Sequence, residues 1–271
     1  MPSRPLGKTG LQVSPIGFGA FKIGRNQGAK YPCGYDLPDE SSVAALLHGV
    51  LDLGVTHIDT APAYGLSEER IGRHLAARRS EFVLSTKVGE TFEAGRSHYA
   101  FDEKSVRDSI HRSLQRLRCD VLDIALIHAP ADDVRVLTET DVAATLVALK
   151  SAGDIRAIGL SGKTVAAARL AQEWADVLMV EYHSRDTSHA ELIAEAAERG
   201  IGVIIKKGLA SGHLPAAEAI PFALHAAGVT NLVVGGLSLP HMAENVRLAE
   251  DAFPSTSASS PLRSHNGVRS R

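Results

Sequence analysis

Four side chains that can hold or move a proton stand close to the ends of short apolar runs. Asp59, Lys87 and His128 each end such a run, and Tyr64 lies five residues after Asp59. A tyrosine is a weak acid near neutral pH unless a nearby cation stabilises its phenolate. Lys87 can supply that cation, Asp59 can keep the lysine charged, and His128 can donate a hydrogen bond to a substrate oxygen. This set suits proton delivery to a carbonyl while a hydride arrives from a cofactor, because no side chain supplies a hydride.

Each of these residues taken alone has a purely structural explanation. Asp59 can cap a turn, Tyr64 can shield a loop, Lys87 can be a surface lysine and His128 can be a core histidine with a satisfied ring. Together they are hard to explain in that way, because the ends of neighbouring parallel strands meet in one place. We therefore interpret the four as one catalytic site.

The elements that must position this site alternate regularly along the chain. We predict strands at Pro15–Gly19, Val55–Asp59, Phe82–Lys87, Val121–Ile127, Ile155–Leu160, Val177–Val180, Gly202–Ile205 and Asn231–Val234. We predict helices at Ser41–Leu53, Ser67–Ala77, Glu103–Leu117, Asp141–Ala152, Thr164–Trp174, His189–Glu198, Ala216–Ala227 and Pro240–Glu250. Units of roughly 30 residues predict an α/β fold, a (β/α)8 TIM barrel whose active site lies at the carboxyl ends of the strands. An open doubly wound sheet is the alternative, but its GxGxxG turn would need glycine where Lys22 stands.

The ends of the chain and of its helices carry further signals. Residues 1–13 contain the turn sequence Gly7–Gly10 and predict a short β-hairpin that plugs the bottom of the barrel, within a single domain over residues 1–253. The Ser-rich residues 254–271 predict a flexible, disordered tail. Asp39 or Ser41 is expected to cap the first helix and Ser67 to open the second, whereas glycines end four of the helices, at positions 54, 153, 200 and 228.

Composition narrows the class of protein. The 271 residues carry 29 basic and 31 acidic side chains, and 44% of them are hydrophobic, which is typical of a globular protein. This charge balance argues against nucleic acid or an anionic membrane as a partner. The two cysteines form no CxxC pair, and neither a signal peptide nor a spanning apolar run is evident, so we predict a cytoplasmic protein. There is no HExxH or Cys/His cluster, so no metal site is expected.

Several motifs together resemble the aldo-keto reductase family. They are Gly7-Lys8-Thr9-Gly10-Leu11, Gly17-Phe18-Gly19, Asp59-Thr60-Ala61-x-x-Tyr64-Gly65, Ser85-Thr86-Lys87, Asp123-x-x-Leu126-x-His128, Gly159-x-Ser161 and Glu244-Asn245. The resemblance runs from about Leu6 to Glu250. It implies that Asp59, Tyr64, Lys87 and His128 form a catalytic tetrad with Tyr64 as general acid/base, and that the cofactor is NADP(H) or NAD(H).

The resemblance also implies a set of ligand contacts. Cofactor contacts are expected at Gly19, Ala20, Asp59, Ser161, Gly162, Met179, Lys206, Lys207, Gly208, Leu209, Ser211, Gly236, Ser238, His241 and Asn245, and substrate contacts at Phe21, Tyr64 and His128. The family commonly has Asn where Gly162 stands, Gln where Met179 stands, a nicotinamide-stacking Tyr where Lys206 stands and Arg where His241 stands. The choice between NAD and NADP therefore stays open.

The pocket that holds the substrate is expected to be framed by Phe21, by residues 24–37 with Tyr31 and Tyr35, and by a loop over Phe92–Phe101. An open, partly polar mouth favours a sugar or another small carbonyl or hydroxyl compound. Two other functions are compatible with the fold: a non-catalytic nicotinamide-binding sensor, and a lyase or isomerase that uses Lys87 as a Schiff base. Oligomeric state is not evident from the sequence.

One motif resembles a nucleotide-binding loop without completing it. Gly159–Thr164 ends in Gly-Lys-Thr, but Ala157 stands where the P-loop fingerprint requires glycine. Nucleotide hydrolysis is not expected, although phosphate binding at the N-terminus of the following helix stays open.

Overall fold

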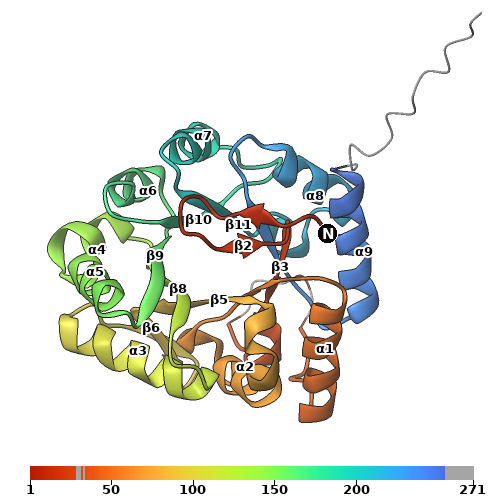
Figure 1. Cartoon of the computed structure of the whole chain (residues 1–271), viewed down its shortest axis with the longest axis horizontal. Helices are drawn as coiled ribbons and strands as arrows, with labels where there is room; N and C mark the ends of the chain where they lie inside the picture. Colours follow the sequence, from red (N-terminus) through yellow and green to blue (C-terminus); the bar gives the residue numbers. More distant parts are fainter. Residues whose placement is uncertain (29–31, 33, 254–271) are drawn as a thin grey trace, which may run out of the picture.

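A computed structural model describes residues 1–28, 32 and 34–253, so the predicted tail and Tyr31 lie outside the described residues. Eight parallel strands follow one another in chain order around a closed barrel (Figure 1). They are β3 (Ile16–Gly19), β4 (His57–Asp59), β5 (Val83–Val88), β8 (Leu122–His128), β9 (Ile155–Ser161), β10 (Val177–Glu181), β11 (Gly202–Lys206) and β12 (Asn231–Gly235). Each predicted strand is present, and the fold is the predicted (β/α)8 TIM barrel.

Helices surround the barrel (Figure 1). In the described part of the chain the α-helices are α1 (Glu40–Asp52), α2 (Ser67–Leu75), α3 (Glu103–Leu117), α4 (Asp133–Glu139), α5 (Val142–Ala152), α6 (Val165–Ala171), α7 (Ala190–Glu198), α8 (Ala216–His225) and α9 (Leu239–Asp251). Short 3-10 helices lie at η1 (Ala20–Ile23), η2 (Pro62–Tyr64), η3 (Ala76–Glu81) and η4 (Ala210–Gly212). The eight predicted helices are confirmed, whereas α4 and the 3-10 turns were not predicted.

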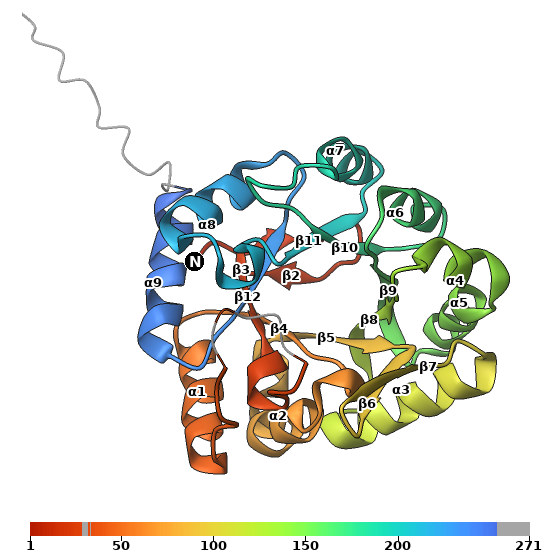
Figure 2. The ribbon, with the colours of Figure 1, turned by 180° about the vertical axis from the view of Figure 1, so that it is seen from behind.

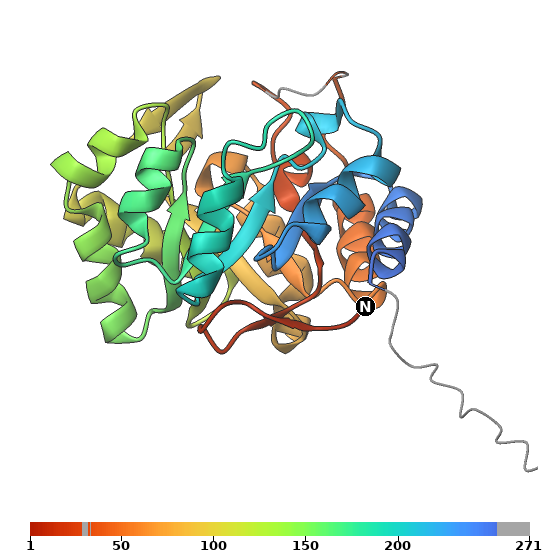
Figure 3. The same cartoon turned by 90° about the horizontal axis from the view of Figure 1, so that it is seen from above.

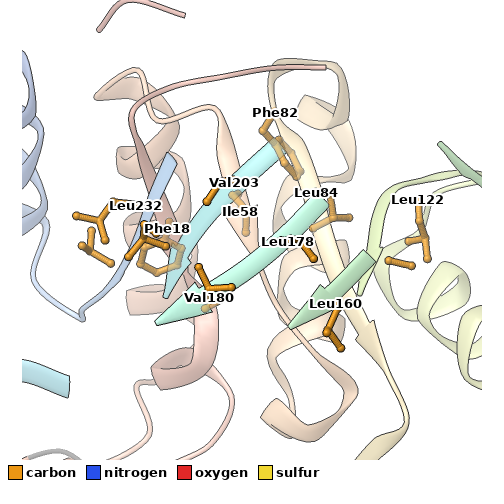
Figure 4. Packing of buried hydrophobic residues seen from close by; sticks show 14 of the residues in the cluster. Phe18, Ile58, Phe82, Leu84, Leu122, Leu160, Leu178, Val180, Val203 and Leu232 are labelled. Carbon is orange, nitrogen blue, oxygen red and sulfur yellow. The ribbon is translucent and has the colours of Figure 1, made fainter. Parts of the chain in front are cut away.

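Side chains point alternately outward and inward along the strands, and this divides the hydrophobic core into two layers. Residues such as Phe18, Leu160 and Leu178 point outward and pack under the helices, and Figure 4 shows part of this outer cluster. Val83 and Leu126 point into the barrel and belong to a smaller inner cluster. Successive side chains of a strand face opposite sides of the sheet, so only every second residue points into the barrel. Which polar residues enter the barrel therefore depends on which alternate positions of each strand point inward.

The first two helices begin as the sequence signals indicate. The Asp39 carboxylate caps α1 by accepting from the Ser42 backbone N–H at 2.7 Å. Ser67 begins α2, as predicted, but its side chain does not cap the helix. Its buried hydroxyl donates to the carbonyl of Ala20 at 2.9 Å and accepts from Thr60 at 2.8 Å, so it ties the start of α2 to η1 instead.

Two hairpins lie at opposite ends of the barrel (Figure 3). The predicted N-terminal hairpin pairs β1 (Arg4–Pro5) with β2 (Gln12–Val13) and covers the base. Its turn presses against β11, because a Cβ on Gly7 would lie 2.4 Å from the backbone nitrogen of Gly202. The second hairpin, β6 (Glu90–Glu93) with β7 (Arg96–Tyr99), replaces the loop expected there and projects beside the mouth. No helix among the described residues is long and apolar enough to cross a membrane.

Candidate active site

The four predicted catalytic side chains meet at the carboxyl ends of the strands, the end of the barrel that faces the viewer in Figure 2. Asp59 ends β4, Lys87 lies one residue before the end of β5, His128 ends β8 and Tyr64 ends η2. All four line one cavity of about 380 Å³. The register explains why, because Asp59 pairs with Ser85 of β5, two residues before Lys87, so that both side chains point inward at adjacent levels.

Asp59 and Lys87 form a buried ion pair. The Lys87 Nζ donates to both carboxylate oxygens of Asp59, at 2.7 and 2.8 Å, and to the Thr60 carbonyl at 2.8 Å. Lys87 is 1% exposed and Asp59 3% exposed. Burial, the largest single influence, lowers the pKa of Lys87, but the charges of Asp59 and Tyr64 and the hydrogen bonds to both together outweigh it, so the net direction is upward. An ammonium that stays charged and donates three hydrogen bonds is a poor nucleophile, which argues against Schiff-base chemistry at Lys87.

Tyr64 lies over this ion pair. The Lys87 ammonium is 4.9 Å from the centre of the Tyr64 ring, and the rings of Phe21 and His128 meet that ring edge-on at 5.1 and 6.0 Å. Burial raises the pKa of Tyr64, and the charge of Lys87 opposes this rise without reversing it. Tyr64 therefore carries its proton at neutral pH, with a cation placed to stabilise the phenolate once the proton has left.

His128 contacts a carboxylate that the sequence analysis did not single out. Its Nδ1 lies 2.7 Å from Oε2 of Glu90 on β6, although that oxygen lies off the line of the ring N–H bond. Burial lowers the pKa of His128, and Glu90 opposes that shift. Burial raises the pKa of Glu90, but His128, Ser97 and Arg25 bring it down to about 2. Glu90 is therefore ionised at neutral pH.

A column of buried polar groups supports Asp59 from below. The Ser85 hydroxyl donates to Asp59 at 2.7 Å and lies 2.9 Å from Nε2 of His57, whose Nδ1 lies 2.9 Å from Oδ1 of Asn231. The Asn231 amide in turn donates to the Ser14 carbonyl at 2.8 Å. These contacts fix the Asp59 carboxylate inside the barrel, where an unpaired charge would be strongly unfavourable.

A second lysine enters the cavity from β11. The Lys206 Nζ donates to the Ser161 hydroxyl at 3.0 Å and to the Gly162 carbonyl at 2.6 Å. No carboxylate of the described residues forms an ion pair with it, whereas the neighbouring Lys207 pairs with Glu181. Burial, together with the charges of Lys207 and Lys87, lowers the pKa of Lys206 to about 7. Lys206 is therefore charged in about half of the molecules at pH 7, and its charge has no carboxylate partner in the described part of the protein.

Comparison with known proteins agrees with this geometry. Residues 15–221 match the model of the Aldo/keto reductase family. The chain belongs to this family. L-galactose dehydrogenase of Arabidopsis thaliana is 33% identical over 229 residues, which are 78% of this chain and 66% of that protein. D-threo-aldose 1-dehydrogenase of a Pseudomonas species is 28% identical over 237 residues, 77% of this chain and 70% of that protein.

Solved structures of the family share the fold over nearly the whole length. A Pseudomonas aeruginosa protein assigned to the aldo-keto reductases superimposes with a TM-score of 0.85 at 40% identity, over 92% of this chain and 94% of that one. The match to curated sequences is shorter, since the chain spans just under two thirds of the plant dehydrogenase. The structural match accordingly supports the fold of the whole described barrel.

The ligand contacts expected of an aldo-keto reductase fall into two groups. Those that line the cavity with the tetrad are Gly19, Phe21, Ser161, Met179, Lys206, Lys207, Gly208, Leu209 and Ser211. Those that do not line it are Ala20, Gly162, Gly236, Ser238, His241 and Asn245. Ala20 is fully buried, and Ser238 caps α9, the helix that carries His241 and Asn245.

The structure corrects one suggestion about phosphate. The N-terminus of α6 is already covered by the Asp133 carboxylate, which accepts from the backbone N–H groups of Lys163 and Thr164, at 2.7 and 2.9 Å, and from the Thr164 hydroxyl. Asp133 is 1% exposed. The Asp133 carboxylate thus occupies these donors, and its charge would repel a phosphate approaching them.

The segment Phe92–Phe101 was expected to frame the pocket, and Tyr99 does line the cavity, but sequence reasoning missed that this segment belongs to the β6–β7 hairpin and that Glu90 also reaches the cavity. The sequence did contain a turn signal, because Ala94-Gly95 separates the two four-residue segments that form the strands. Both residues have positive φ, 49° and 80°, as a two-residue hairpin turn of type I′ requires. The runs themselves are polar, so they lack the apolar alternation by which strands are usually recognised.

Proposed function

We propose that this aldo-keto reductase is an NAD(P)-dependent oxidoreductase that interconverts an aldehyde, ketone or sugar with its alcohol, with Tyr64 as general acid/base. One observation carries the proposal: a protonated tyrosine and a carboxylate-bound lysine ammonium lie together in a cavity with a histidine. Two relatives are named as sugar dehydrogenases, which supports a sugar or similar polyol as the substrate.

The chain's own residues account for the proton. In the reductive direction Tyr64 donates its phenolic proton to the substrate oxygen, and Lys87 stabilises the phenolate that remains. Asp59 keeps Lys87 charged and in place. In the oxidative direction the same groups act in reverse, and the phenolate accepts the hydroxyl proton.

The cavity also has the chemistry that a nicotinamide dinucleotide requires. Lys206, Lys207 and Lys163 bring positive charge for a diphosphate, Ser161 offers a hydroxyl, and Met179, Leu209 and Val233 add apolar wall. We propose that Ser161 and Lys206 contact the cofactor. When bound, the cofactor supplies or accepts the hydride.

The test is turnover followed by nicotinamide absorbance, with NADH and NADPH against simple aldehydes and with NAD and NADP against a set of aldoses. Tyr64→Phe should lower kcat by about 10²- to 10⁴-fold while cofactor binding, followed by fluorescence, survives. Tyr99→Phe is the matched control, because it removes a hydroxyl from the same cavity and should change kcat far less. Near-normal turnover of Tyr64→Phe would exclude Tyr64 as the acid/base.

A further inference from the structure

Glu90 is held rigidly beside the catalytic histidine. It begins β6, opposite Tyr99 of β7, and its side chain is 11% exposed. Its two carboxylate oxygens have different partners: Oε1 accepts from the Ser97 hydroxyl at 2.6 Å, and Oε2 lies 2.7 Å from Nδ1 of His128. The two contacts leave Glu90 little freedom to turn away from His128.

The contact decides which ring nitrogen of His128 carries a hydrogen. An ionised carboxylate oxygen at 2.7 Å repels a nitrogen lone pair, so Nδ1 must bear the hydrogen even though the N–H bond is not aimed straight at Oε2. In a neutral imidazole only one nitrogen is protonated. The Nε2 of His128 is therefore a hydrogen-bond acceptor when the ring is neutral and a donor only when the ring is protonated.

The Nε2 atom is the one available to a ligand. No hydrogen bond joins it to another residue of the described chain, and His128 lines the cavity. The charged and titratable groups around the ring are Glu90 of β6, Lys87 of β5, Lys206 of β11 and Tyr64 of η2. The two lysines disfavour the imidazolium and Glu90 favours it.

We propose that Glu90 is a positioning residue that fixes the Nδ1–H tautomer of His128, so that the neutral ring accepts a hydrogen bond from an alcohol substrate and the protonated ring donates one to a carbonyl substrate. The inference rests on the proposed function and deepens it. Glu90 itself does not touch the substrate. With this tautomer, KM for the alcohol rises as pH falls through the pKa of His128, and KM for the carbonyl compound rises as pH increases through it.

The tautomer can be measured without any substrate. Long-range ¹H–¹⁵N spectra of protein labelled at histidine, recorded between pH 5 and 9, distinguish the two neutral forms, and the His128 signals are those missing from His128→Asn. In the native protein we expect Nδ1–H. In Glu90→Gln we expect Nε2–H, because Ser97 holds the amide oxygen and turns the amide N–H₂ toward Nδ1. Nε2–H in the native protein, or the same tautomer in both proteins, would overturn the proposal.

Kinetics tests the consequence for the two substrates. In Glu90→Gln, KM for the alcohol at pH 8 should rise about tenfold, the equivalent of one lost hydrogen bond, and KM for the carbonyl should lose its dependence on pH. Glu93→Gln is the control, because Glu93 lies on the same strand but is exposed. A switched tautomer with both KM values unchanged would refute the pairing of His128 with substrate. Absence of turnover in the native protein would instead refute the proposed function and leave the tautomer result standing.

Discussion

The buried pair of Asp59 and Lys87 makes a strong prediction about stability. Lys87→Met removes three hydrogen bonds of 2.7–2.8 Å and leaves the Asp59 carboxylate, 3% exposed, with Ser85 as its remaining donor among the described residues. An uncompensated buried charge of this kind costs about 3–5 kcal/mol. We expect the free energy of unfolding at pH 7.5, from urea titration followed by circular dichroism, to fall by that amount.

Two further variants separate lost charge pairing from lost packing. Asp59→Asn combined with Lys87→Met removes both charges and should be more stable than Lys87→Met alone, because no buried carboxylate is left unpaired. Lys150→Met is the control: Lys150 also contacts both oxygens of an aspartate, Asp176, at 2.6 and 2.7 Å, but the pair is 39% and 25% exposed, so the loss should be about 0.2–1 kcal/mol. A loss below about 1 kcal/mol for Lys87→Met, or a double variant less stable than the single one, would refute the reasoning.

Two other predictions concern the walls of the site. Gly24→Ala would place a Cβ 2.1 Å from the carbonyl oxygen of Tyr64, so it should lower the free energy of unfolding by about 1–3 kcal/mol and turnover by up to about 100-fold. Gly34→Ala is the control and should change neither, because its Cβ would have no atom within 4 Å. Equal effects of the two substitutions in thermal melting and turnover assays would contradict this prediction. Burial and the neighbouring lysines lower the pKa of Lys206 from its ordinary value of 10.5 to about 7 in the folded protein, so between these pH values the unfolded chain binds a proton that the folded protein does not, and folding stability rises with pH there. The stability advantage of Lys206→Met over the native protein should accordingly be largest at pH 7 and shrink toward pH 10 in urea titrations, and an advantage that grows with pH would show the shift to be of opposite sign.

The barrel and its tetrad were predictable because both depend on local order. A strand ends where its apolar run ends, and the carboxyl ends of all strands in a parallel barrel meet at one mouth. The positions of Asp59, Lys87 and His128 therefore follow from the order of apolar runs along the sequence. The same argument applies to Lys206, which directly follows the predicted strand Gly202–Ile205 and lines the cavity. Such a prediction succeeds wherever a residue's position in its own strand determines where it lies in the fold.

Contacts between distant segments could not be predicted in this way. His57, Ser85 and Asn231 meet inside the barrel because β4, β5 and β12 present them on inward positions, and nothing in the sequence around any of them indicates the other two. Asp133 covers the start of α6 from another helix. Glu90 reaches His128 only because the polar β6–β7 hairpin lies beside the mouth, and polar strands give weak signals.

The N-terminal hairpin has a consequence for kinetics. Leu6, Leu11 and Val13 pack into the inner cluster at the base, so the cavity is closed below and opens at a single end of the barrel. Two reactants that bind in a cavity with one opening must both enter and leave through that opening. Whichever of them lies deeper has to enter first and leave last, and the shallower one can exchange while its companion stays in place. If the proposed cofactor and substrate bind in this cavity one below the other, their order of binding and release is compulsory, and product inhibition should be competitive against the first reactant and not against the second.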